Sequence, residues 1–123
     1  MREIDAASVE QRSELGCSAG PEAFSVEIRP DRGRVLIVPH GELDLDTVPA
    51  VAAQVDELIA RGFDALVIDL RETSFIDSSA VHLLIKCAQR TDARFTVIDG
   101  PRTVSRVFDL AGVRDFLAFE TAA

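Results

Sequence analysis

The sequence predicts a single α/β domain in which helices flank a mixed sheet, with an antiparallel pair of strands first and a mostly parallel remainder. Strand-like and helix-like runs alternate along most of the chain, an order typical of sheets with helical crossovers. Before them, two strand-like runs are separated by a short turn, which predicts that these strands are antiparallel. The chain has 123 residues, of which 47% are hydrophobic, and this is enough for one packed core.

The first two strands are expected on either side of Pro30–Gly33, which has the residues of a tight turn. Residues Phe24–Ile28 alternate apolar and polar side chains, a pattern that indicates a half-exposed strand. Residues Val35–Val38 are all apolar and predict a more buried strand. We expect this second strand to end at Pro39–Gly41.

A helix is expected next, because apolar residues recur at helical spacing between Thr47 and Gly62. Asp46 or Thr47 can cap its first turn, into which Pro49 also fits. Gly62 suits the left-handed conformation that commonly ends a helix. The expected buried face consists of Val48, Val51, Ala52, Val55, Leu58 and Ile59.

The middle of the chain predicts a strand, a loop and a second helix. Ala65–Leu70 is short and nearly all apolar, as in a strand that is covered on both faces. Arg71–Phe75 is expected to be a loop. Helical spacing then predicts a helix from Val81 to Ala88. Its expected buried stripe consists of Val81, Leu84, Ile85 and Ala88.

The last third of the chain predicts two more strands around a third helix. Phe95–Ile98 is expected to be a strand, and Phe116–Phe119 a last short one. Gly112 is expected to end the helix between them. The buried stripe of that helix is expected to consist of Val104, Val107, Phe108 and Ala111.

Asp77, Ser78 and Ser79 stand directly before the second helix. Side-chain oxygens in this position accept hydrogen bonds from the first free N–H groups of a helix, and the positive end of the helix dipole favours a phosphate there. Spacing alone favours a simple helix start over a phosphorylation site, because Asp-Ser-Ser is a short and common string. Because Asp44 and Asp77 both follow strands, we expect both at the carboxyl end of the sheet, where ligands and partners usually bind.

Composition argues against several classes of function. The net charge of −8 is unlike that of nucleic-acid-binding proteins, and the absence of Trp and Tyr removes the strongest platforms for stacking bases. No apolar run approaches the ~20 residues of a membrane span, and no secretory signal is visible, so we expect a cytoplasmic protein. Cys17 falls in an expected tail and Cys87 in an expected helix, so no disulfide is expected.

Metal, cofactor and catalytic sites are not expected either. The His and Cys residues lack the spacing of metal ligands, and there is no glycine-rich phosphate loop. Ser78 and His82 could share one helix face as a nucleophile and a base. However, the sequence has no Gly-x-Ser-x-Gly elbow, and only the helix N-terminus could serve as an oxyanion hole. We therefore expect no cofactor, no metal and no enzymatic activity.

Three short motifs occur in order along the chain: Gly41–Asp44 (Gly-Glu-Leu-Asp), Ile76–Val81 (Ile-Asp-Ser-Ser-Ala-Val) and Val107–Gly112 (Val-Phe-Asp-Leu-Ala-Gly). Together they resemble the STAS domain, and more narrowly the bacterial anti-sigma-factor antagonists. The resemblance covers residues 24–120, leaving residues 1–23 as an N-terminal extension that we expect to be mobile and 121–123 as a C-terminal tail. It implies a STAS-like mixed sheet flanked by helices.

The resemblance also implies a partner-switching regulator. In this family the unmodified protein binds an anti-sigma factor with serine kinase activity and thereby frees a sigma factor. The kinase phosphorylates the Ser that follows the Asp of the second motif, here Ser78, which ends binding, and a phosphatase acting on phospho-Ser78 would reset the switch. The implied partner-binding residues around Ser78 are Asp44, Asp46, Thr47, Asp77, Ser79 and His82. The alternative is a non-switching STAS scaffold or a transport-associated adaptor subunit.

The sequence departs from the family pattern in two places. Ala80 stands where members often have Gly, and we expect only a small local effect because Ala is compatible with a helix. Members usually carry a further helix after the last strand, whereas this sequence stops just past it. We therefore expect one face of the sheet to lack that cover, with the N-terminal extension as a candidate to replace it.

Overall fold

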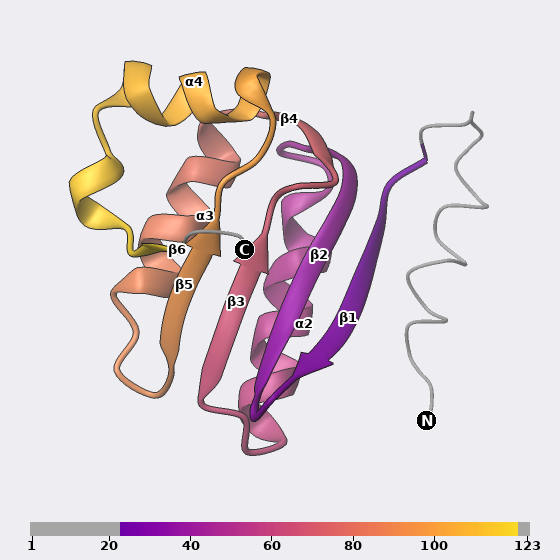
Figure 1. The fold of residues 1–123 in the computed structure, drawn as a ribbon. Helices are drawn as coiled ribbons and strands as arrows, with labels where there is room; N and C mark the ends of the chain where they lie inside the picture. Colours follow the sequence, from indigo (N-terminus) through magenta and orange to yellow (C-terminus); the bar gives the residue numbers. More distant parts are fainter. Residues whose placement is uncertain (1–22, 121–123) are drawn as a thin grey trace.

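The structure of the protein, a computed structural model, describes residues 23–120. Helices and strands alternate around one sheet, as Figure 1 shows. The expected N-terminal extension, including Cys17, lies outside the described residues apart from Ala23. In chain order the elements are β1 (Ser25–Asp31), β2 (Arg34–Leu43), α2 (Val48–Ala60), β3 (Ala65–Asp69), β4 (Thr73–Ile76), α3 (Ser78–Ala88), β5 (Arg94–Ile98), α4 (Arg102–Ala111), a 3₁₀ helix (Arg114–Phe116) and β6 (Phe119–Glu120).

The sheet is mixed, as the sequence predicted. Its strands lie in the order β1-β2-β3-β5-β6, and β4 pairs with the end of β2. The β1–β2 pair is antiparallel, and every other pairing is parallel. The helices α2 and α3 lie on one face of the sheet, and α4 crosses near the end at which β4 lies (Figure 1).

β2 is longer than predicted, and β4 was missed altogether. β2 continues past Pro39 to Leu43, with an irregular register between Gly41 and Glu42, where Gly41 has a φ of 107°. A positive φ of this kind is easily adopted by glycine. The continuation pairs with β4, which occupies most of the expected loop, and the buried Thr73 hydroxyl donates to the Pro39 carbonyl at 2.9 Å. A four-residue strand held by such tertiary contacts has too short a pattern to be recognised in the sequence.

The prediction for the C-terminal segment was also wrong in detail. Arg114–Phe116 forms a 3₁₀ helix, and the last strand is shifted to Phe119–Glu120. The guanidinium of Arg114 lies over the rings of Phe108 and Phe119, with 5.7 and 4.9 Å to the ring centroids. The contact of this cation with two aromatic rings and the burial of Leu117 anchor the segment. Tertiary contacts of this kind leave no periodic pattern in the sequence.

α3 begins three residues earlier than the predicted run, at Ser78. Its buried residues are Ala80, Val81, Leu84 and Cys87, so Cys87 takes the place that the stripe assigned to Ala88, which is exposed. The side chain of Ala80 is fully buried where the family often has Gly. The Ala80 methyl group is therefore part of the core beneath the second motif.

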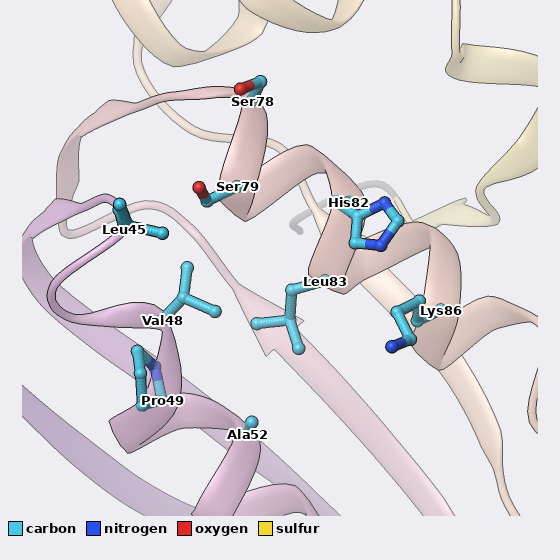
Figure 2. A pocket seen from close by; sticks show the side chains of 9 residues that line it. All are labelled: Leu45, Val48, Pro49, Ala52, Ser78, Ser79, His82, Leu83 and Lys86. Carbon is cyan, nitrogen blue, oxygen red and sulfur yellow. The ribbon is translucent and has the colours of Figure 1, made fainter.

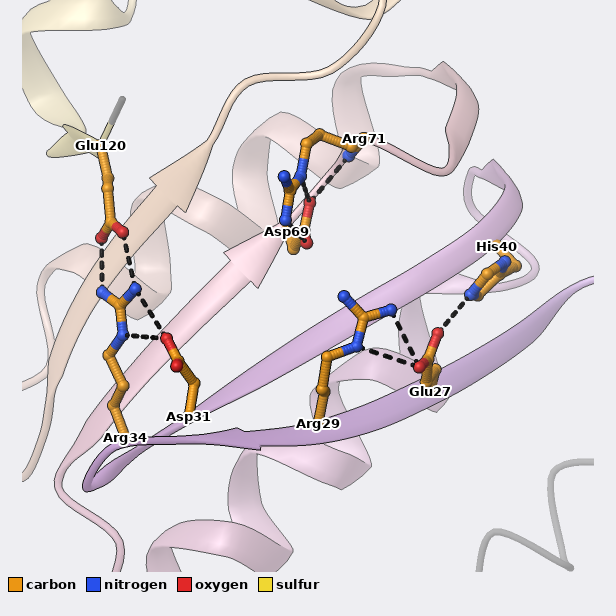
Figure 3. Close-up of polar contacts among 8 residues, drawn as sticks. All are labelled: Glu27, Arg29, Asp31, Arg34, His40, Asp69, Arg71 and Glu120. Carbon is orange, nitrogen blue, oxygen red and sulfur yellow. Dashed lines mark hydrogen bonds and ion pairs between the residues drawn. The ribbon is translucent and has the colours of Figure 1, made fainter. Parts of the chain in front are cut away.

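The two faces of the sheet differ in character. The helix-covered face holds the main core, to which α2, α3 and α4 contribute. On the other face a small buried cluster of apolar residues lies on the middle of the strands. Charged side chains of the same face border this cluster and form hydrogen bonds with one another (Figure 3). Two of these contacts are the Arg34–Glu120 pair at 2.6 Å and the Arg71–Asp69 pair at 2.8 Å. The cluster consists of Leu36, Val38, Val67 and Ile98.

Candidate functional site

The site is built where β2 and β4 end side by side. The two strands are parallel, and Leu43 at the end of β2 pairs with Ile76 at the end of β4. Asp44 follows Leu43, and Asp77 follows Ile76. The loop after β2 and the start of α3 therefore lie next to each other. The sequence predicted this common end from topology, and the unpredicted strand β4 is what makes the two segments direct neighbours.

Asp77 caps α3 and also holds the neighbouring loop. It adopts an extended backbone, and its Oδ1 accepts hydrogen bonds from the N–H groups of Ser79 at 2.9 Å and Ala80 at 3.1 Å. Its Oδ2 accepts a third, from the N–H of Leu45 at 3.1 Å. One carboxylate thus satisfies two free donors of the helix and one of the loop, which fixes the loop against the helix end.

The loop from Asp44 to Thr47 is closed by its own hydrogen bonds. The Thr47 hydroxyl donates to the Glu42 carbonyl and accepts from the Asp44 N–H, both at 2.8 Å. Asp44 Oδ1 accepts from the N–H of Asp46 at 3.0 Å and from that of Thr47 at 3.2 Å. Thr47 occupies the N-cap position of α2 as expected, but its hydroxyl is used by the loop rather than by the helix.

Ser78 is the first residue of α3, and its side chain is exposed. Among residues 23–120 its hydroxyl has no hydrogen-bond partner, which leaves the oxygen open to solvent and to another protein. Ser79 is half-buried beside it, and His82 lies exposed one turn further along the helix. No hydrogen bond joins Ser78 to His82 within this described part.

An apolar groove runs from this serine between the two helices, as Figure 2 shows. We call it the α2–α3 groove, and its volume is about 660 Å³. The sequence-predicted residues Ser78, Ser79 and His82 line one wall, whereas Asp44, Asp46, Thr47 and Asp77 are outside its lining. The lining residues are Leu45, Val48, Pro49, Ala52, Ser78, Ser79, His82, Leu83 and Lys86.

Sequence reasoning missed most of the apolar lining. Val48 and Ala52 were assigned to the buried face of α2, yet both are only half-buried because they border the groove. Leu45 is 71% exposed at the mouth of the groove, between two Asp residues. Leu45 and Leu83 were the available signals, since both are large apolar residues that belong to neither expected helical stripe.

Charge is unevenly distributed around the groove. Asp44, Asp46 and Asp77 gather at the Ser78 end, while the first turn of α3 contains no acidic residue. Lys86, the one lysine of the sequence, stands at the other end. Within residues 23–120 there is no group of three or more His, Cys, Asp or Glu side chains that could hold a metal ion, and no helix of that part is long and apolar enough to cross a membrane.

The mixed sheet of six strands, with α2 and α3 on one face and an exposed serine at the start of α3, defines a small α/β domain. Residues 24–122 match the family model of the STAS domain. The chain therefore belongs to the STAS domain family.

Several proteins that the chain resembles are named anti-sigma factor antagonists. The chain is 26% identical over 106 residues to the anti-sigma-F factor antagonist RsfB of Mycobacterium tuberculosis, covering 84% of this chain and 87% of RsfB. It resembles the unphosphorylated form of the anti-sigma factor antagonist SpoIIAA, with a TM-score of 0.64 and 27% identity over 82% of this chain and 89% of that one. The phosphorylated form of Bacillus SpoIIAA matches with a TM-score of 0.59 and 26% identity, covering 82% and 92%.

Proposed function

We propose that this protein is an anti-sigma-factor antagonist whose partner is an anti-sigma factor with serine kinase activity. In the unphosphorylated form it binds that partner and thereby releases a sigma factor. Phosphorylation of Ser78 ends the binding, and a phosphatase restores it. The observation that carries the proposal is the exposed, unbonded hydroxyl of Ser78 at the mouth of an apolar groove. RsfB and SpoIIAA, named as antagonists, support it.

The fold should tolerate a phosphate on Ser78. Phosphorylation adds roughly −1.5 to −2 charges and three acceptor oxygens. Ser78 stands at the N-terminus of an eleven-residue helix, where the dipole and the remaining free N–H groups favour negative charge. Because the Ser78 side chain is exposed, the phosphate displaces no core residue. The scaffold and its cap at Asp77 should therefore persist after modification.

A bound partner should not tolerate the same phosphate. Asp44, Asp46 and Asp77 already make the Ser78 end of the groove acidic, so a partner that matches this surface would meet added bulk and excess negative charge. An unpaired charge desolvated in an interface costs several kcal/mol, on the order of a thousandfold in affinity. A covalent change at one atom can then switch the complex without refolding the protein.

The proposal is tested by comparing wild type with Ser78→Ala and Ser78→Asp. The host anti-sigma factor kinase should be retained by immobilised Ser78→Ala at least as well as by wild type, and weakly by Ser78→Asp. With that kinase and ATP, wild type should gain the mass of one phosphate and Ser78→Ala none. Ser79→Ala is the matched control, since it removes a neighbouring hydroxyl and should still be modified.

A different result would favour the non-switching alternative. If no candidate kinase adds a phosphate, and Ser78→Asp binds the same partners as wild type, the domain acts as a scaffold or as a transport-associated adaptor. Modification of Ser79 in place of Ser78 would overturn the assignment of the phosphorylated residue while leaving the switch itself intact.

A further inference from the structure

The two helical segments that form the α2–α3 groove contact each other at both of its ends. At the Ser78 end, the Leu45 N–H donates to Asp77 at 3.1 Å. At the far end, one turn past the lining residues, Arg90 just beyond α3 pairs with Asp56 of α2 at 3.0 Å. The two segments that form the walls are therefore joined to each other at either end of the groove.

The wall that α3 contributes has a regular composition. Ser78, His82 and Lys86 follow one another at four-residue intervals and so form a row along one side of the helix. Figure 2 shows all three beside the apolar floor, to which Val48 and Leu83 contribute. At a rise of about 1.5 Å per residue, the row from Ser78 to Lys86 spans roughly 12 Å.

The walls restrict the backbone of what can bind. Both are helices, so nearly all of their backbone N–H and C=O groups are already bonded within α2 and α3. An extended segment lying in the groove would find no edge strand to pair with and would bury unsatisfied backbone groups. A helix satisfies its own backbone and presents apolar side chains at intervals of three and four residues. The geometry favours a helix as the occupant.

The charges restrict which helix can bind. Lys86 has no ion pair within residues 23–120, whereas Arg90, the next cation along the chain, is paired with Asp56 and Asp92. Lys86 is thus a free cation at the far end of an apolar groove in a protein of net charge −8. A carboxylate delivered there would gain a partner, and His82 lies one turn away on the same wall.

We infer that the groove receives a short amphipathic helix of the anti-sigma factor. The helix lays its apolar stripe on Val48, Ala52 and Leu83 and places an Asp or Glu against Lys86, about two turns from the side chain that meets Ser78. This inference rests on the proposed function and adds to it the form and charge of the partner segment. Lys86 then determines specificity, while Ser78 is the switch.

The test uses the full chain and the purified host anti-sigma factor kinase that Ser78→Ala retains. Lys86→Glu should weaken binding roughly tenfold or more, because it replaces an attractive interfacial charge by a repulsive one. Arg106→Glu is the matched control, since Arg106 is also exposed and without an ion pair in the described part but lies on α4, outside the lining of the groove. It should bind like wild type. Thermal unfolding of both variants verifies that each is folded.

The partner segment is identified by photo-crosslinking. A benzoylphenylalanine at position 83 should crosslink to a segment of the kinase whose apolar residues repeat at helical spacing beside an Asp or Glu. The same probe at exposed Arg106 on α4 should not reach that segment. Replacing the partner's carboxylate by Lys should restore binding to Lys86→Glu.

The results separate this inference from the proposed function. Wild-type affinity in Lys86→Glu, or crosslinks from position 83 to a segment without that helical pattern, would overturn the docked helix even if Ser78 is phosphorylated normally. If Ser78 accepts no phosphate while Lys86→Glu still weakens binding and charge exchange restores it, the docking stands and the switch fails. If no anti-sigma factor kinase binds any variant, both are wrong.

Discussion

The Asp77 carboxylate accepts a hydrogen bond from the backbone N–H of Leu45 at 3.1 Å, across a separation of 32 positions in the chain. The same side chain caps α3 through Ser79 and Ala80. The position of the loop after β2 is therefore tied to the first turn of the helix that carries Ser78. The two halves of the proposed interface should move and unfold together.

Replacing Asp77 by Ala should loosen both halves at once. Loss of the cap and of the loop contact should lower the free energy of unfolding by roughly 1–2 kcal/mol. The Leu45 amide should exchange with solvent much faster in Asp77→Ala, as measured by hydrogen exchange with NMR. Asp46→Ala is the control, because the exposed Asp46 side chain makes no hydrogen bond or ion pair with α3 among the described residues. Unchanged Leu45 protection in Asp77→Ala would contradict the coupling.

Thr47 should stabilise the loop through its hydroxyl rather than through helix capping. Thr47→Val keeps the shape of the side chain but removes the contacts to Glu42 and Asp44, both at 2.8 Å. We expect a loss of roughly 1–2 kcal/mol in urea unfolding, because a carbonyl and an amide lose their partner. Thr47→Ser retains the hydroxyl and should lose much less. Equal stability of the two variants would show that the hydroxyl contributes nothing.

How far the sequence predicted this fold depends on the length of each pattern. The helical stripes that end at Gly62 and Gly112 were recognisable because several apolar residues repeat in each, and both glycines have positive φ in the structure. β4 was missed because four residues carry no usable period, and its buried Thr73 is held by a contact to the distant Pro39. Short elements specified by distant partners leave little trace in local sequence.

The site was predicted in part for a related reason. Asp44 and Asp77 were expected at one end of the sheet because each follows a strand, and topology alone brings them together. The groove was not foreseen, because Val48 and Ala52 fit the helical pattern of ordinary core residues. Periodicity reports that a residue faces inward, but it does not report whether the space beside it is filled.

Asp69 should make stability sensitive to acid. Burial alone would raise the pKa of its carboxyl, but hydrogen bonds from the side chain and backbone of Arg71 hold that pKa below its ordinary value of 3.8. Because the folded-state pKa is lowered, the stabilisation is present above pH 3.8 and is lost as the pH falls through the folded-state pKa.

Arg71→Met tests this dependence. It leaves Asp69 buried with fewer partners, so the free energy of unfolding at pH 7 should fall by roughly 1–3 kcal/mol. The acid-induced loss of stability should also begin at a higher pH. Burial raises the pKa of the Asp69 carboxyl, and without the Arg71 guanidinium fewer hydrogen bonds lower it. Arg61→Met is the control, since the Arg61–Glu57 pair is exposed and should contribute at most about 0.5 kcal/mol. Identical pH profiles for Arg71→Met and wild type would contradict the assignment.

Cys87 should be inert in the folded protein. Burial raises the pKa of its thiol from 9.0 to about 11, so at pH 8 the reactive thiolate is scarce as well as inaccessible. In a Cys17→Ser background, iodoacetamide should label Cys87 only after denaturation. Stability should also decline between pH 9 and 11, as the unfolded thiol ionises first. Rapid labelling of the native protein would show that this part of α3 opens readily.

The central claim is that a phosphate on Ser78 repels the partner and leaves the fold intact. The most direct measurement is the affinity of the anti-sigma factor kinase for stoichiometrically phosphorylated and unmodified protein by titration calorimetry, with the fold of each followed by NMR. We predict that phosphorylation weakens binding by roughly a hundredfold or more and changes amide shifts only near residues 44–47 and 77–82. Equal affinities, or a loss of binding accompanied by unfolding, would contradict the claim.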